Sequence, residues 1–109
     1  MSMIIIGSLG GSKNDDRQVV EVADGITSDW YLIPQGTLQT SVECIPAGTA
    51  KVQYSSDIEG AKAGSAVGID WPADSVTAPA MLNINGGNIC VRVVSATGAA
   101  KMIINRTKA

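Results

Sequence analysis

Short runs of apolar or alternating residues, separated by turn residues, cover most of the chain. In residues 38–44 the apolar side chains Leu38, Val42 and Cys44 share one face, which is typical of a strand with one buried side. Closely spaced strands with glycine- and proline-containing turns favour two packed sheets. We therefore predict an all-β fold, an antiparallel β-sandwich of jelly-roll or immunoglobulin-like type with about seven to eight short strands. The runs that predict strands are residues 3–6, 17–23, 29–33, 38–45, 49–55, 80–84, 88–95 and 100–105.

The connections between these runs predict how the strands pair. Short turns at residues 46–48, 85–87 and 96–99 predict three local hairpins, the last two forming an antiparallel meander. Residues 57–79 contain several glycines and prolines but little alternation, so we expect a long surface loop. This loop is expected to cover one end of the sandwich through Trp71, and to be most mobile at residues 60–65.

The N-terminal segment differs from the other predicted strands. Residues 3–6 are apolar at every position, so both faces of this strand require burial. Glycines at positions 7, 10 and 11 and the polar residues 13–17 then form a flexible joint. We divide the chain into an N-terminal arm or edge strand with a glycine-rich joint, residues 1–12, and a single β-sandwich domain, residues 13–109. The arm is hypothesised to add as a strand to a neighbouring subunit, and the alternative is pairing within its own sandwich.

Composition narrows the classes of partner. The chain has 109 residues, with 8 Lys and Arg against 10 Asp and Glu, which gives a net charge of −2. A balance of this kind provides no basic surface for nucleic acid or an anionic membrane. The longest apolar run is also far too short to cross a bilayer. Charged residues make up only 17% of the chain, which favours a protein that covers part of its surface with a partner, for example as a homo-oligomer.

The residues that usually carry chemistry are scarce. The chain has no histidine, which removes the commonest general base and the commonest metal ligand. Residues 7–12 are rich in glycine, but Lys13 is not followed by the Ser or Thr of a phosphate-binding loop. The acidic pairs Asp15–Asp16 and Asp57–Glu59 lack the spacing of a calcium loop. We therefore expect no catalytic, cofactor-binding or metal-binding residues, no cofactor, and a protein that is not an enzyme.

The sequence also predicts where the two cysteines and the two tryptophans lie relative to the core. Cys44 is expected to point into the core and Cys90 to point outward with Arg92, which is poor geometry for a disulfide. Two free thiols in a reducing compartment of synthesis are the favoured interpretation, and a disulfide is the alternative. Trp30 and Trp71 are expected to fill the core of a chain that has no phenylalanine.

Three segments in the second half of the chain carry a recognisable pattern. Residues 48–56 match a Gly-Thr-Ala-x-Val-x-x-Ser strand, and Trp71 lies in the variable segment that follows. Residues 89–98 match a second strand, Ile/Leu-x-Val-Arg-Val-x-x-x-x-Gly, and residues 101–105 match a final short one. Over roughly residues 36–106 this pattern resembles small virion structural proteins of tailed bacteriophages. It implies a head decoration (cement) protein or a neck, tail or fibre accessory protein, without catalytic residues.

Our first hypothesis is accordingly a non-enzymatic capsid decoration protein, synthesised in the host cytoplasm and located in the virion. Its expected partners are further copies of itself, with a trimer favoured, and the major capsid protein or another virion protein. A small carbohydrate- or protein-binding β-sandwich module is the alternative, which exposure of Trp30, Tyr31 and Trp71 together would favour. The apolar strand at the N-terminus and apolar side chains on outward strand faces give the candidate interface residues, Met3, Ile4, Ile5, Ile6, Val94 and Ile103.

Overall fold

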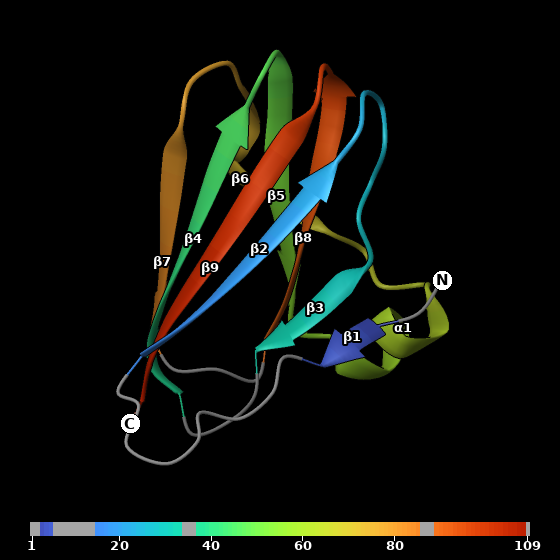
Figure 1. The fold of residues 1–109 in the computed structure, drawn as a ribbon. Helices are drawn as coiled ribbons and strands as arrows, with labels where there is room; N and C mark the ends of the chain where they lie inside the picture. Colours follow the sequence, from blue (N-terminus) through green and yellow to red (C-terminus); the bar gives the residue numbers. More distant parts are fainter. Residues whose placement is uncertain (1–2, 6–14, 34–36, 86–88, 109) are drawn as a thin grey trace.

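Two β-sheets pack face to face and account for most of the structure, a computed structural model that describes residues 3–5, 15–33, 37–85 and 89–108 (Figure 1). Within these residues there are nine strands and one short helix. One sheet has the strand order β1-β3-β8-β5-β6 and the other the order β2-β9-β4-β7. The bounds are β1 Met3–Ile5, β2 Asp15–Val22, β3 Trp30–Ile33, β4 Thr37–Pro46, β5 Thr49–Ser55, α1 Ile58–Ala63, β6 Ile69–Val76, β7 Ala80–Asn85, β8 Ile89–Thr97 and β9 Ala100–Lys108.

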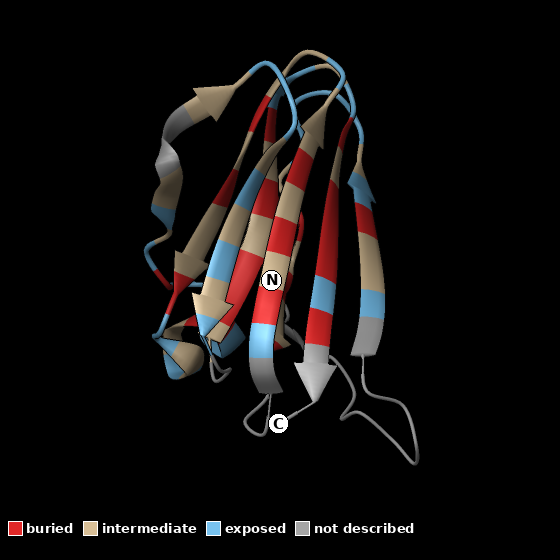
Figure 2. Ribbon diagram, turned by 90° about the vertical axis from the view of Figure 1, so that its left-hand side faces the viewer, coloured by how far each residue is buried: buried red, intermediate tan, exposed pale blue. Residues whose placement is uncertain are grey.

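The core lies between the sheets and follows the alternation that the sequence predicts. Buried positions alternate with more exposed ones along several strands, as the bands in Figure 2 show. The main cluster joins Val42 and Cys44 of β4, Val91 and Val93 of β8, and Met102 of β9 with their neighbours. The predicted all-β sandwich is therefore confirmed. No helix in the described part of the chain is long and apolar enough to span a membrane.

Strand pairing differs from the predicted hairpins. β4 and β5 follow each other along the chain but lie in different sheets, and the same is true of β7 and β8 and of β8 and β9. β9 instead pairs with β2 and β4, and β8 pairs with β3 and β5. The three predicted hairpins and the meander are therefore wrong. Their turns cross from one sheet to the other, as in a jelly roll. The sequence did not reveal this, because a strand's pattern of buried and exposed residues is the same whichever neighbour it pairs with.

Residues 57–79 do not form the expected irregular loop. Asp57 caps the helix α1, because its Oδ1 accepts a hydrogen bond from the Gly60 amide at 2.9 Å. Gly64 ends the helix with a φ of 77°, a left-handed conformation that glycine adopts easily. The chain then enters the edge strand β6, where Trp71 pairs with Val52 and is only half-buried. Trp71 therefore does not cover an end of the sandwich, and residues 60–65 are largely a helical turn and its cap.

The N-terminal strand pairs within its own chain. β1 runs parallel to β3, with Met3 opposite Trp30 and Ile5 opposite Leu32. The structure thus has the intramolecular pairing that was the alternative to an arm on a neighbouring subunit. Ile6 and the glycine-rich joint lie outside the described residues, and the division of the chain at residue 12 stays a prediction.

The expected phases of the two cysteines are confirmed. Cys44 lies in the main core between the sheets. Cys90 lies in a second cluster on the outer face of the five-stranded sheet, with Trp30 and Ala61 of the helix α1. Both are buried, unpaired thiols. Burial raises the pKa of Cys44 to about 11, and burial followed by the charge of Asp57 also raises the pKa of Cys90.

Candidate functional site

A groove of about 550 Å³ lies at the end of the four-stranded sheet where β2 and β4 end and β9 begins. These strand ends are at the top of Figure 1. Three alanines, Ala23, Ala47 and Ala99, contribute to its lining from three different turn segments. All three are exposed, so the groove opens to solvent. Their small side chains leave room between the turns that larger residues would fill. The remaining lining residues are Glu21, Val22, Ile45, Pro46, Ala100 and Lys101.

The polar part of the groove is an ion pair at its rim. Lys101 Nζ lies 3.6 Å from Glu21 Oε1, and the two side chains are 43% and 69% exposed. Register places Glu21 of β2, Lys101 of β9 and Ile45 of β4 in one row across the sheet. Their neighbours in sequence, Val20 and Cys44 among them, point into the core, so this row faces outward. An exposed pair of this kind contributes at most about 1 kcal/mol, so either charge can take another partner at little cost.

Hydrogen bonds fix the turns around the groove. The Ala47 amide donates to the Ala99 carbonyl at 2.9 Å, joining two of the walls. Asp24 Oδ1 accepts from the Gly98 amide at 2.7 Å, which ties the segment after β2 to the turn before β9. Ser95 reinforces this link, because its hydroxyl accepts from the Gly25 amide and donates to the Gly98 carbonyl. These hydrogen bonds tie the walls of the groove to one another.

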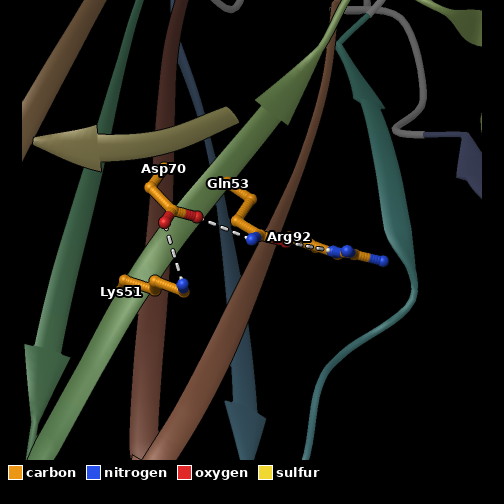
Figure 3. A network of polar contacts seen from close by, with 4 residues as sticks. All are labelled: Lys51, Gln53, Asp70 and Arg92. Atoms are coloured by element: carbon orange, nitrogen blue, oxygen red, sulfur yellow. Dashed lines mark hydrogen bonds and ion pairs between the residues drawn. The ribbon is translucent and has the colours of Figure 1, made fainter. Parts of the chain in front are cut away.

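The outer face of the other sheet carries a row of polar side chains across three strands (Figure 3). Gln53 of β5 pairs in register with Arg92 of β8 on one side and with Asp70 of β6 on the other. Asp70 accepts from Gln53 Nε2 at 2.7 Å and from Lys51 Nζ at 2.9 Å. These two hydrogen bonds, that from Gln53 first, lower the pKa of Asp70, which holds this carboxylate ionised. Gln53 Oε1 in turn accepts from Arg92 Nε at 2.8 Å.

Trp30 extends this row onto β3. The Arg92 guanidinium carbon lies 4.3 Å from the centre of the Trp30 ring, within the range of a cation–π contact. Trp30 itself is fully buried, because the helix α1 and residue Ala66 cover it. The expectation that Trp30 is a core residue is confirmed, although its core is this second cluster on the outer face. The sequence placed Arg92 on the outward face with Cys90, but gave no signal of its ring contact.

The candidate interface residues fall on different parts of the molecule. Ile103 lies on the outward face of β9 and is only 8% exposed. Val94 is half-buried on the outward face of β8, where it bridges to Thr27. Met3, Ile4 and Ile5 form β1, on the edge of the same sheet as β8. Their role in an interface, and self-association itself, stay predictions that light scattering of the purified protein would test.

The groove was missing from the sequence prediction. Alanines in turns give no chemical signal, and the three segments come together only through the pairing of β9 with β2 and β4. Among the described residues, no three Cys, Asp or Glu side chains gather as metal ligands.

Comparison with known protein families finds no match, and a comparison with curated protein sequences finds none either. Solved structures do match. A cupin superfamily protein from Desulfitobacterium hafniense has a TM-score of 0.52 at 14% identity, over 94% of this chain and 75% of that one. An oxalate oxidase has a TM-score of 0.56 at 14% identity, over 87% of this chain and 42% of that one. The cupin domain of Schizosaccharomyces pombe Cnp3 has a TM-score of 0.51 at 11% identity, over 94% of this chain and 58% of that one.

These likenesses correct two expectations. The resemblance to bacteriophage virion proteins is wrong, and with it the capsid decoration function, because the matching structures include several cupin proteins and an oxalate oxidase. Short β-strands with a shared Val-Arg-Val pattern occur in unrelated sandwiches, so the pattern did not identify a lineage. The expectation that the chain is not an enzyme is also contradicted, because oxalate oxidase is built on this fold. At these identities the likeness establishes the architecture alone, a β-sandwich of the cupin type.

Proposed function

We propose that this protein is a binding domain of the cupin fold that holds an apolar side chain of a partner polypeptide in the groove at the end of the four-stranded sheet. The observation that carries the proposal is the groove itself, with its alanine walls and its Glu21–Lys101 rim. Its volume of about 550 Å³ lies within the range of ligand sites. Its turns are fixed by hydrogen bonds, so little ordering would oppose binding.

The lining favours a polypeptide over a free small molecule. Small ligands are usually enclosed over most of their surface, whereas the walls at Ala23, Ala47 and Ala99 are exposed. An open apolar groove suits a side chain that is presented by a larger partner. The rim pair then offers Lys101 as a donor and Glu21 as an acceptor to the backbone on either side of that side chain.

Trp30, Tyr31 and Trp71 do not form an exposed platform for a sugar ring. Their joint exposure was expected to favour a carbohydrate- or protein-binding module. Trp30 is fully buried, and Tyr31 and Trp71 are half-buried. None of the lining residues of the groove is aromatic.

The test is selection of peptides by the purified protein from a random display library, followed by binding measurements on variants. Ala99→Trp fills the groove from an exposed position and should weaken the selected peptides by roughly tenfold or more. Ala63→Trp, at an exposed position on the helix α1, is the matched control and should leave affinity unchanged. Failure to select any peptide, or equal binding by Ala99→Trp, would refute the proposal.

A further inference from the structure

Arg92 is held in place by two neighbours that leave the end of its side chain unused. Gln53 holds Nε through a hydrogen bond of 2.8 Å, and the guanidinium carbon lies over the Trp30 ring, 4.3 Å from its centre. The part of the chain that the structure describes gives Arg92 no ion pair with a carboxylate, and no hydrogen bond from its terminal nitrogens. In Figure 3 these nitrogens point away from Asp70, toward β3.

The carboxylate at the other end of this row of side chains, Asp70, is already occupied. Asp70 takes its hydrogen bonds from Lys51 and Gln53, so its charge is balanced by Lys51 and reaches Arg92 only through the neutral Gln53. Burial lowers the pKa of Arg92, a sign that its positive charge has lost part of its hydration. A half-buried cation of this kind gains when an anion joins it.

The backbone around Gln53 keeps it aimed at Arg92. Gly68, in the segment that leads into β6, lies against the Gln53 side chain, and a Cβ added there would come within 2.7 Å of Gln53 Cδ. A side chain at position 68 would therefore push Gln53 aside. Gln53 is therefore a positioning residue for the guanidinium.

We propose that Arg92, oriented by Gln53 and Trp30, is a recognition site for an oxyanion, a carboxylate or phosphate group that accepts two hydrogen bonds from the terminal nitrogens. A guanidinium presents two parallel N–H groups that match the two oxygens of such an anion. Pre-orientation matters because an exposed arginine loses side-chain freedom when it binds, whereas Arg92 has already lost it. This site lies on the opposite sheet from the groove, so it is independent of the function proposed above.

The test is NMR titration of the ¹⁵N-labelled arginine side chains with sodium acetate and with inorganic phosphate, against sodium chloride at equal ionic strength. The proposal predicts saturable shifts of the Arg92 Nε and terminal N–H signals with at least one of the two oxyanions and not with chloride. Saturation by acetate alone identifies a carboxylate ligand, and saturation by phosphate alone identifies a phosphate ligand. Shifts that grow linearly and equally with all three salts would overturn the proposal.

Substitutions distinguish binding through paired hydrogen bonds from a simple attraction between opposite charges. Arg92→Lys keeps the charge but loses the paired N–H groups, and should weaken the saturating anion by roughly tenfold. Gln53→Met keeps Arg92 but removes its Nε partner, and should weaken the anion by a smaller factor, about two- to fivefold. Arg17→Lys, at an exposed position on β2, is the matched control. The proposal would be contradicted if Arg92→Lys bound the anion with full affinity, or if Arg17→Lys lost as much affinity as Arg92→Lys.

Discussion

Replacement of Trp30 by alanine tests the claim that a second core stabilises the outer face of the five-stranded sheet. Trp30 is fully buried beneath the helix α1, in contact with a cluster that includes Ala61 and Cys90. An aromatic side chain of this size buries about 200 Å², which at about 25 cal/mol per Å² corresponds to about 5 kcal/mol. Measured losses for such truncations are about 3–5 kcal/mol, and the Arg92 contact adds up to about 1 kcal/mol.

The assay is urea unfolding followed by circular dichroism, with hydrogen exchange to locate the change. Trp30→Ala should lower the free energy of unfolding by about 3–5 kcal/mol and reduce amide protection in α1. Trp30→Phe should lower the free energy of unfolding by less than Trp30→Ala does. It keeps an aromatic ring, and the indole Nε1 that it removes is buried without a hydrogen bond to any described residue. Trp71→Ala, on the edge strand β6, is the control and should cost less than Trp30→Ala. A loss of stability below about 1 kcal/mol for Trp30→Ala, or a larger loss for Trp71→Ala than for Trp30→Ala, would show that this second cluster does not stabilise the fold.

Further predictions concern the turns and the thiols. Gly98→Ala should destabilise the protein more than Gly25→Ala in urea unfolding, because both residues have φ near +75° but only Gly98 also approaches Gly48 closely. Equal losses would show that the contact with Gly48 is unimportant. Cys44 and Cys90 should resist a thiol reagent in the native protein and both react after unfolding; rapid native labelling would contradict their burial. The pKa of Cys44 rises from 9.0 to about 11 on folding, so stability should fall as pH rises through this window, and Cys44→Ala should reduce that slope.

The sequence predicted the strands far better than their partners. Seven of the described strands begin and end close to the bounds of a predicted run, and an eighth strand, β1, lies within the predicted run 3–6. The helix α1 and the strand β6 were missed, because a six-residue helix is too short to show a period of 3.6 and β6 contains a proline. The phases of Cys44 and Cys90 were correct because each depends only on its own strand.

The candidate sites could not be predicted because both depend on pairing. The groove needs β2, β4 and β9 in one sheet, whereas the sequence suggested that β9 pairs with β8. The Arg92 site needs Gln53 and Trp30 on either side of β8, from segments far away in the chain. Local turn residues carry no information about such neighbours when a turn crosses between sheets.

Intermolecular NOEs would show whether a bound peptide occupies the groove. The protein is labelled with ¹³C at alanine methyl groups and mixed with an unlabelled peptide selected from the display library. We expect contacts from the methyl groups of Ala47 and Ala99, which lie on two walls of the groove, to one apolar side chain of the peptide. The methyl group of Ala63, on α1, should show none. Peptide contacts at Ala63 without contacts at Ala47 and Ala99 would exclude the groove as the binding site.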